Sequence, residues 1–157
     1  MIATLKHLSL NVSETNKFWL DAQIDPAVHR ESDLLAFQIA IERGDPGTLM
    51  AAYNKVNGMY CAGNDPILNG VVKSAWRYKG WIHSDWQAVH HWDYALKGLD
   101  QQSGAQLDER EWFSEPLAQA SRERGPGFQR AHLRHGAPDA AFVLCGGHRC
   151  LAINARG

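Results

Sequence analysis

The sequence predicts an α/β fold in which short parallel strands alternate with helices. Short apolar segments recur between longer segments whose apolar residues have helical spacing. Two Asp-Pro pairs, Asp25-Pro26 and Asp65-Pro66, mark helix starts, because Asp is a favoured N-cap and Pro suits the first helical position. An order of strand, helix, strand and helix favours parallel strands joined by crossover helices.

The first strand is predicted at 2–5, and Lys6-His7 lies at its carboxyl end. The polar segment 11–23 is expected to be a loop. A helix is predicted over 25–44, since its apolar residues form a stripe and a Gly followed by a Pro stops it. The apolar segment 48–53 is the second predicted strand.

The pattern then repeats. The Asn-Gly pair near 58 predicts a turn-rich loop. The remaining predicted elements are a helix at 65–76, a strand at 81–85, a helix from 94 that turns into a fourth short strand at 98–101, and a last amphipathic segment at 109–122, which Asp108 caps. About four strands are therefore expected, whereas a complete barrel needs eight strands and about 250 residues.

Composition restricts the partners. With 157 residues, 16 basic and 17 acidic side chains, the chain fits one domain and gives no electrostatic reason to expect nucleic acid or an anionic membrane. No apolar segment approaches the ~20 residues of a membrane span, and no signal peptide is visible. Neither a nucleic-acid nor a membrane partner is expected.

Cysteine usage gives no reason to expect a disulfide framework or a metal. The chain has three cysteines, Cys61, Cys145 and Cys150, at irregular spacing. His148 lies between the last two, but no second pair of ligands accompanies them, so no zinc site is predicted. No strand is followed by a Gly-rich phosphate-binding sequence, so no nucleotide cofactor is expected either.

Polar side chains gather where the predicted strands end: Lys6 and His7, then Tyr53, then Asp85. In barrels and open parallel sheets, ligands bind at the carboxyl edge of the strands. A carboxylate there, followed by Trp86, is typical of a sugar-cleaving site, because the acid can attack an anomeric carbon and the indole can stack on the sugar. The alternative is an Asp that caps a helix and a Trp that fills the core.

Several segments, in order, resemble the family 3 glycoside hydrolases, the β-glucosidase-like group. They are Lys6-His7-Leu8, Asp21-Ala22-Gln23, Met50-Ala51-Ala52-Tyr53-Asn54-Lys55-Val56-Asn57-Gly58 and Ser84-Asp85-Trp86. The resemblance implies that 1–124 is part of the N-terminal domain of that family, the C-terminal half of a (β/α)8 TIM-type barrel. It also implies retaining hydrolysis of a β-linked glucoside or related oligosaccharide through a glycosyl-enzyme intermediate.

The resemblance also assigns roles. Asp85 matches the nucleophile, and Trp86 matches the aromatic residue on which the leaving group stacks. The sugar-holding positions are matched by Lys6, His7, Met50 and Tyr53. Lys17 stands where the family usually has an Arg, and a lysine cannot make the bidentate contact of an arginine.

Other departures concern completeness. The family's acid/base glutamate and two sugar-binding residues before Lys6 have no counterpart in the sequence. Gln87 replaces a common Gly, and His83 replaces a small apolar residue. The chain is therefore expected to be an incomplete, inactive part of a larger enzyme, and the remainder of that enzyme would be its partner. The sequence does not identify the compartment, and a periplasmic or secreted parent enzyme is one option. The alternative is a non-catalytic product that binds sugar weakly.

Residues 125–157 form an atypical tail that is rich in His, Arg and Gly and lacks periodicity, so irregular structure is expected there. Residues 132–149 can be encoded so that reading one base later gives ISDMVRRMLRSFCAVGI, a helical pattern. We therefore hypothesise that the tail is a frameshifted reading of the parent gene. Sequencing the source DNA across codons 122 to 132 tests this, and an intact frame there would rule it out.

Overall fold

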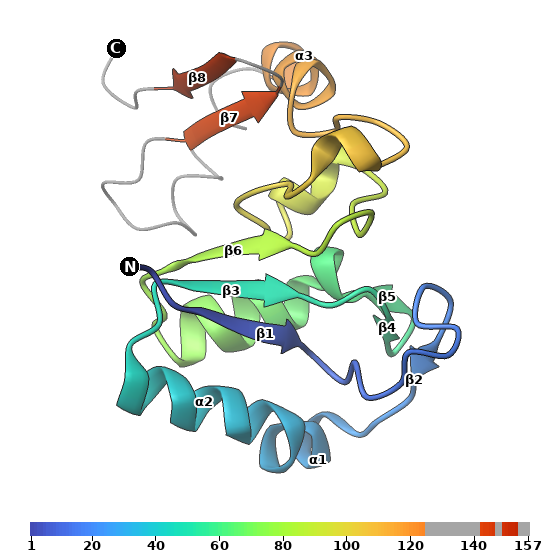
Figure 1. The fold of residues 1–157 in the computed structure, drawn as a ribbon, viewed down its shortest axis with the longest axis vertical. Helices are drawn as coiled ribbons and strands as arrows, with labels where there is room; N and C mark the ends of the chain where they lie inside the picture. The colour runs from blue at the N-terminus through green and yellow to red at the C-terminus, as the bar shows by residue number, and fades with distance from the viewer. Residues whose placement is uncertain (125–141, 147–148, 154–157) are drawn as a thin grey trace.

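The computed structural model describes residues 1–124, 142–146 and 149–153. At its centre lies a parallel sheet with the strand order β1-β3-β6 (Figure 1). The strands are β1 (Thr4–Leu8), β3 (Thr48–Ala51) and β6 (Trp81–Ser84). The prediction of parallel strands with intervening helices is thereby confirmed, although β1 runs through Lys6 and His7 instead of ending before them.

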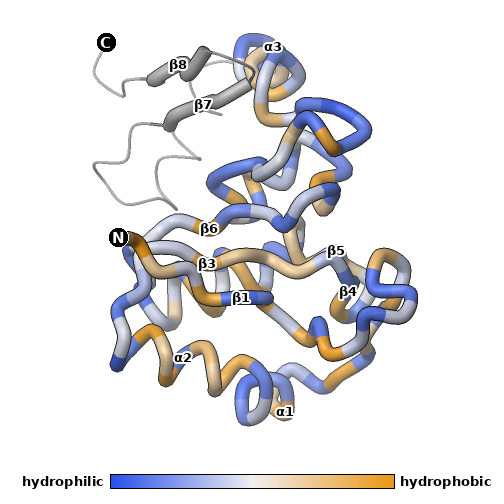
Figure 2. The backbone as a smooth tube through the Cα atoms, in the orientation of Figure 1, coloured by the Kyte–Doolittle hydropathy of each residue, from blue (hydrophilic) through white to orange (hydrophobic). Residues whose placement is uncertain are grey.

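The helix predicted over 25–44 is divided in two. α1 (Pro26–Glu31) begins after Asp25, whose carboxylate accepts hydrogen bonds from two backbone N–H groups of the first turn. Ser32 has φ −118° and ψ −104°, which is not helical, and α2 (Asp33–Gly44) starts after it. Ser32 Oγ donates to the carbonyl of Val28 at 2.7 Å, so its side chain competes with the helical backbone at the break. Figure 2 shows hydrophobic and hydrophilic residues alternating along α2.

The second predicted helix forms as η2 (Pro66–Ala75), a helix of π type. Its Leu68, together with Leu34 of α2, packs with Leu49 and Ile82 of the sheet in one buried core. Each of these side chains is almost inaccessible to water. Full burial of such a side chain is worth about 1.5–3 kcal/mol, so this core supplies the main stabilisation of the sheet.

The end of the predicted loop 11–23 and the predicted turn-rich loop together form a small second sheet. Its strands are β2 (Asp21–Ala22), β4 (Lys55–Val56) and β5 (Met59–Tyr60), and the 3₁₀ turn η1 (Cys61–Gly63) follows. Asn57 and Gly58 join β4 to β5 with φ of 50° and 82°, the left-handed conformation that tight hairpin turns require. β2 pairs with β4, so the loop 11–23 is anchored to this hairpin.

The fourth predicted strand, 98–101, is reduced to a single bridge between His83 and Gln101. Asp100 explains this, because its carboxylate Oδ2, and not a backbone carbonyl, accepts the hydrogen bond of the Ile82 N–H at 2.8 Å. The sheet therefore has three strands and not four. The remaining helical elements are η3 (Trp92–Ala95), η4 (Ala105–Leu107) and α3 (Glu115–Arg124), and α3 begins later than the predicted segment 109–122.

Part of the tail is regular. β7 (Phe142–Gly146) and β8 (Arg149–Ile153) pair as an antiparallel hairpin, so the expectation of irregular structure is wrong for these residues. The other positions of the tail, 125–141, 147–148 and 154–157, lie outside the described residues. Within the part of the chain that the structure describes, no helix has the length and hydropathy of a membrane span.

Candidate active site

An irregularity in β1 brings two adjacent polar residues to the carboxyl edge of the sheet. Leu5 pairs with Leu49 and Leu8 pairs with Ala51, so three steps along β1 match two steps along β3. The extra residue lies within the segment that contains Lys6 and His7. Such bulges redirect side chains, and they are common beside active sites.

Asp85 follows directly after β6, and its carboxylate is held at both oxygens. The Tyr53 hydroxyl donates to Oδ1 at 2.9 Å, and the backbone N–H of Trp86 donates to the same oxygen at 2.8 Å. His7 Nε2 lies 3.3 Å from Oδ2. The backbone N–H of Asp85 donates to the Ala51 carbonyl at 3.1 Å. The orientation of this carboxylate is therefore fixed by groups on β1 and in the segments that follow β3 and β6.

Tyr53 is the neutral partner in this arrangement. Burial, followed by the hydrogen bond and the charge of Asp85, raises the pKa of Tyr53 well above its ordinary value. Its hydroxyl therefore keeps its proton and acts as a donor. The Phe18 ring packs edge-on against the Tyr53 ring with centroids 4.7 Å apart.

The loop before β2 brings a charged pair over Tyr53. Lys17 Nζ lies 4.7 Å from the centroid of the Tyr53 ring and 2.8 Å from Glu14 Oε2. The hydrogen bond and the charge of Lys17 lower the pKa of Glu14. Lys17 is thus part of the cluster, and it is already paired.

Met50 lies on β3, the strand next to β6, and Lys6 lies on β1, on the other side of β3. Met50 is in register with His83, which is buried and whose ring Nδ1 lies 3.0 Å from the Ser84 carbonyl oxygen. Burial lowers the pKa of His83, the hydrogen bond with the Ser84 carbonyl and the charge of Asp85 oppose this, and the charge of Lys6 makes a smaller contribution in the lowering direction. The exposed Lys6 therefore lies within electrostatic reach of the strand that carries Asp85.

Trp86 presents its side chain to solvent and is 56% exposed. Its ring packs against Gly104, where an added Cβ would come within 2.5 Å of Trp86 Cδ1. Gln87, the next residue, has φ 65°, so the departure from glycine at this position places a side chain in a conformation that favours glycine.

The structure therefore places some predicted residues in contact with Asp85 and others further away. His7, Tyr53 and the Trp86 backbone contact Asp85, and Lys17 lies over the Tyr53 ring. Met50 lies on β3, next to β6, and Lys6 lies on β1, on the other side of β3. Among the described residues, no group of three or more His, Cys, Asp or Glu side chains could hold a metal ion. Cys145 and Cys150 are paired backbone positions of β7 and β8, and His148 lies outside the described residues.

Sequence reasoning missed Asp108 as a neighbour of the site. Its charge contributes to the raised pKa of Tyr53, and burial raises the pKa of Asp108 itself. Gln102 Nε2 donates to Asp108 Oδ2. The sequence offered a helix-cap signal at this position, and only the fold shows that the loop turns back towards Tyr53.

The same segments match known proteins. The sequence model described as Glycosyl hydrolase family 3 N terminal domain matches residues 1–105. Probable beta-glucosidase J of Emericella nidulans is 38% identical over 101 residues, which cover 64% of this chain and 12% of that protein. Thermostable beta-glucosidase B of Acetivibrio thermocellus is 37% identical over 98 residues, 62% of this chain and 13% of that protein. The chain thus spans about an eighth of the length of these relatives.

Solved structures agree with the sequence comparison. DesR, a beta-glucosidase from Streptomyces venezuelae in complex with D-glucose, superimposes with a TM-score of 0.76 and 33% identity over 86% of this chain and 18% of that one. Beta-glucosidase 3B from Thermotoga neapolitana gives a TM-score of 0.75 and 30% identity over 82% of this chain and 19% of that one. The chain belongs to glycosyl hydrolase family 3 and has the α/β fold of the family's N-terminal domain.

Proposed function

We propose that the chain carries the nucleophile side of a retaining β-glucosidase-type active site, with Asp85 as the nucleophile. The observation that supports this proposal is the carboxylate at the end of β6, held at both oxygens by Tyr53, His7 and the Trp86 N–H. Nucleophilic attack on an anomeric carbon needs an oriented carboxylate, because small misplacements lower the rate strongly.

The neighbouring side chains would hold the sugar. Lys6 and His7 would bind its hydroxyl groups, Met50 and Tyr53 would line the subsite, and Trp86 would stack on the leaving group. The exposed indole of Trp86 supports its role, because an aromatic face open to solvent can receive a ring. Lys17 would reach the same subsite from the loop, although its pairing with Glu14 limits its reach.

We further propose that the three parallel strands correspond to strands of the C-terminal half of a (β/α)8 barrel. Residues 1–124 would then be one part of that barrel domain. The relatives include an exo-alpha-(1->6)-L-arabinopyranosidase from Bifidobacterium longum, 37% identical over 87 residues. The sugar and linkage that this chain would accept therefore stay open. A β-linked glucoside is the proposed class, since the relatives named beta-glucosidase predominate among the similar proteins described above.

A second candidate is a chain that binds sugar without turning it over. A retaining site needs another carboxyl group about 5–5.5 Å from the nucleophile. The two other carboxylates that act on Tyr53 are Glu14, which is paired with Lys17, and Asp108, which Gln102 holds. Glu14 is already paired, whereas burial raises the pKa of Asp108 and its Oδ1 has no hydrogen-bond partner among the described residues, so the second candidate requires that Asp108 does not act as the acid.

A glucoside with an activated leaving group tests Asp85 without an acid catalyst. We expect a dinitrophenyl 2-deoxy-2-fluoro-glucoside to form a covalent glycosyl ester on Asp85 of the 157-residue chain, detected by peptide mass spectrometry. The Asp85→Asn variant is the matched control and should remain unlabelled. A label on another carboxylate, or none on a chain shown to be folded by circular dichroism, would refute the assignment. Binding of glucose without labelling would favour the second candidate.

A further inference from the structure

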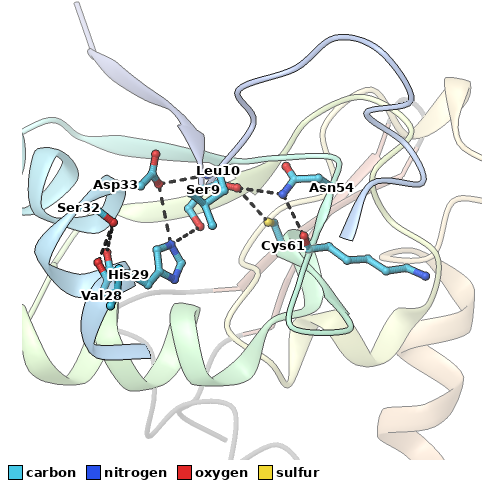
Figure 3. A network of polar contacts seen from close by, with 9 residues as sticks. Ser9, Leu10, Val28, His29, Ser32, Asp33, Asn54 and Cys61 are labelled. Carbon is cyan, nitrogen blue, oxygen red and sulfur yellow. Dashed lines mark hydrogen bonds and ion pairs between the residues drawn. The ribbon is translucent and has the colours of Figure 1, made fainter. Parts of the chain in front are cut away.

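A buried polar network surrounds Ser9, with His29 on one side and Asn54 and Cys61 on the other (Figure 3). The Ser9 carbonyl accepts a hydrogen bond from Asn54 Nδ2 at 3.2 Å and one from Cys61 Sγ at 3.4 Å. Ser9 Oγ lies 3.1 Å from His29 Nε2. The exposed fractions of Ser9, Asn54 and His29 are 0%, 1% and 3%, so water does not compete for these bonds.

The network joins two segments that end in the active site. Ser9 lies two residues after His7, and Asn54 directly follows Tyr53. His7 and Tyr53 are the two side chains that contact opposite oxygens of Asp85. A shift between the end of β1 and the segment after β3 would therefore pull one of these contacts away from the carboxylate.

The trio of Ser9, His29 and Asp33 is not a nucleophilic triad. The Ser9 hydroxyl and Asp33 Oδ2 both face Nε2 of His29, at 3.1 Å and 3.9 Å, whereas a triad uses both ring nitrogens. Asp33 Oδ2 instead accepts the Leu10 N–H at 3.1 Å. The trio thus attaches the end of β1 to α1 and α2.

The side chain of Asn54 is not the one that stability alone would favour at this position. Its Oδ1 is buried and has no hydrogen-bond partner among the residues that the structure describes. A buried acceptor without a partner destabilises a fold, and an apolar side chain would avoid that cost. The benefit of Asn54 therefore lies in the two bonds of its Nδ2, to the carbonyls of Ser9 and Lys55.

We propose that Ser9 and Asn54 are positioning residues of the Asp85 site, because their hydrogen bond keeps His7 and Tyr53 at the distance that both oxygens of Asp85 require. Cys61 assists as a second donor to the same carbonyl, and burial raises the pKa of its thiol to about 12, so it keeps its proton. His29 ties the other side of Ser9 to α1. The proposal rests on the proposed function, which makes Asp85 the reacting group.

Asn64 provides a matched control. It is 2% exposed, its Nδ2 donates to the Val56 carbonyl at 3.2 Å, and its Oδ1 accepts the Ile67 N–H at 3.2 Å. Asn54→Ala and Asn64→Ala thus each remove a buried amide. Both variants are compared with the wild-type chain at a temperature where circular dichroism shows all three folded.

The first readout is the rate at which the 2-deoxy-2-fluoro-glucoside labels Asp85. Asn54→Ala should slow labelling about tenfold or more, because a small displacement of the groups that orient a reacting carboxylate lowers the rate strongly. Asn64→Ala should label at the wild-type rate. Equal rates in all three chains, or equal slowing in both variants, would overturn the positioning role.

The second readout does not depend on glycoside chemistry. Carbon NMR of tyrosine labelled at Cζ reports, at neutral pH, the hydrogen bond that the Tyr53 hydroxyl donates to Asp85, and Tyr53→Phe assigns the signal. Asn54→Ala should loosen this bond and move the Tyr53 carbon shift, whereas Asn64→Ala should not. If no chain is labelled by the glucoside, the proposed function fails, and this carbon shift still decides the positioning role. An unchanged Tyr53 carbon shift in Asn54→Ala would overturn it.

Asn54→Leu decides the question where Asn54→Ala does not fold. Leucine fills a similar space, removes both bonds of Asn54 Nδ2 and brings no unpartnered buried acceptor of its own. Labelling of Asn54→Leu should be slower by about tenfold, as in Asn54→Ala. Labelling and a Tyr53 carbon shift both identical to wild type would overturn the proposal.

Discussion

The cluster around Asp85 and the network around Ser9 are adjacent, yet they differ in their access to water. The site cluster combines charges with open side chains, such as the exposed Trp86 and the Glu14–Lys17 pair. The network around Ser9 is buried, and it consists of a serine, an asparagine, a cysteine and a histidine. An open, charged cluster is accessible to a ligand, whereas a buried network holds its side chains in a fixed geometry.

The difference follows from competition with solvent. An exposed ion pair contributes little to stability, because water solvates both partners. A hydrogen bond in the buried network has no such competitor, and breaking it leaves a partner unsatisfied. Changes in the site cluster should therefore alter chemistry more than stability, and changes in the network should alter both.

The largest effect is expected for Tyr53→Phe. It removes the hydroxyl that donates to Asp85 Oδ1, and hydrogen bonds to charged groups are worth about 1.5–3 kcal/mol. Labelling of Asp85 should slow by about ten- to a hundredfold. Urea denaturation should show a smaller change in the free energy of unfolding, because the Trp86 N–H still donates to Asp85 Oδ1 in the variant. If Tyr53→Phe lost much stability but was labelled at the normal rate, the site cluster would act on stability and not on chemistry, contrary to the contrast between the two regions.

A smaller effect is expected for Trp86→Ala. Removal of the exposed indole should slow labelling by glucosides with an aryl leaving group about two- to tenfold, the range of one lost aromatic contact. Labelling by the corresponding glycosyl fluoride should stay unchanged, because fluoride does not stack. Trp81→Ala, at the other end of β6, is the control and should show no dependence on the leaving group. Equal slowing with both reagents would argue against stacking.

Acidification should weaken the buried region. Burial lowers the pKa of His29 below its ordinary value, although Asp33 opposes this, and burial lowers the pKa values of His83 and His90 as well. In acid the unfolded chain therefore binds more protons than the folded chain. Stability is full above a pH of about 6.5, the pKa of an unfolded histidine, and falls as the pH drops towards the folded pKa.

Urea denaturation at several pH values measures this dependence. His29→Gln should flatten it, because one of the three histidines no longer titrates. The same dependence in the variant and in the wild type would show that His29 does not contribute.

The smallest effect is expected for Glu14→Gln. Glu14 pairs with Lys17 on an exposed loop, and its loss should leave the midpoint of urea denaturation unchanged. Labelling of Asp85 should change only slightly, since Lys17 keeps its place over the Tyr53 ring. If Glu14→Gln lowered the midpoint of urea denaturation as far as Asn54→Ala does, the loop would contribute to stability as much as the buried network. The contrast between the site cluster and the network would then be wrong.

The sequence determined the alternation of parallel strands and helices, because apolar spacing and Asp-Pro starts are local signals. It also determined which residue types stand at the strand ends, including Asp85 and Tyr53. Two local predictions were wrong for reasons that sequence spacing does not reveal. Ser32 divides one helix through its own side chain, and Asp100 replaces the backbone partner that a fourth strand would have supplied.

Only the tertiary structure decided how the polar residues meet. The irregular pairing of β1, the fold of the loop that brings Lys17 to Tyr53, and the bond between Ser9 and Asn54 each join residues from different segments. Such contacts depend on the register of strands and on the packing of the core below them, which no local pattern records. The sequence therefore predicted which polar residues lie near the strand ends, and their relative geometry became visible only in the fold.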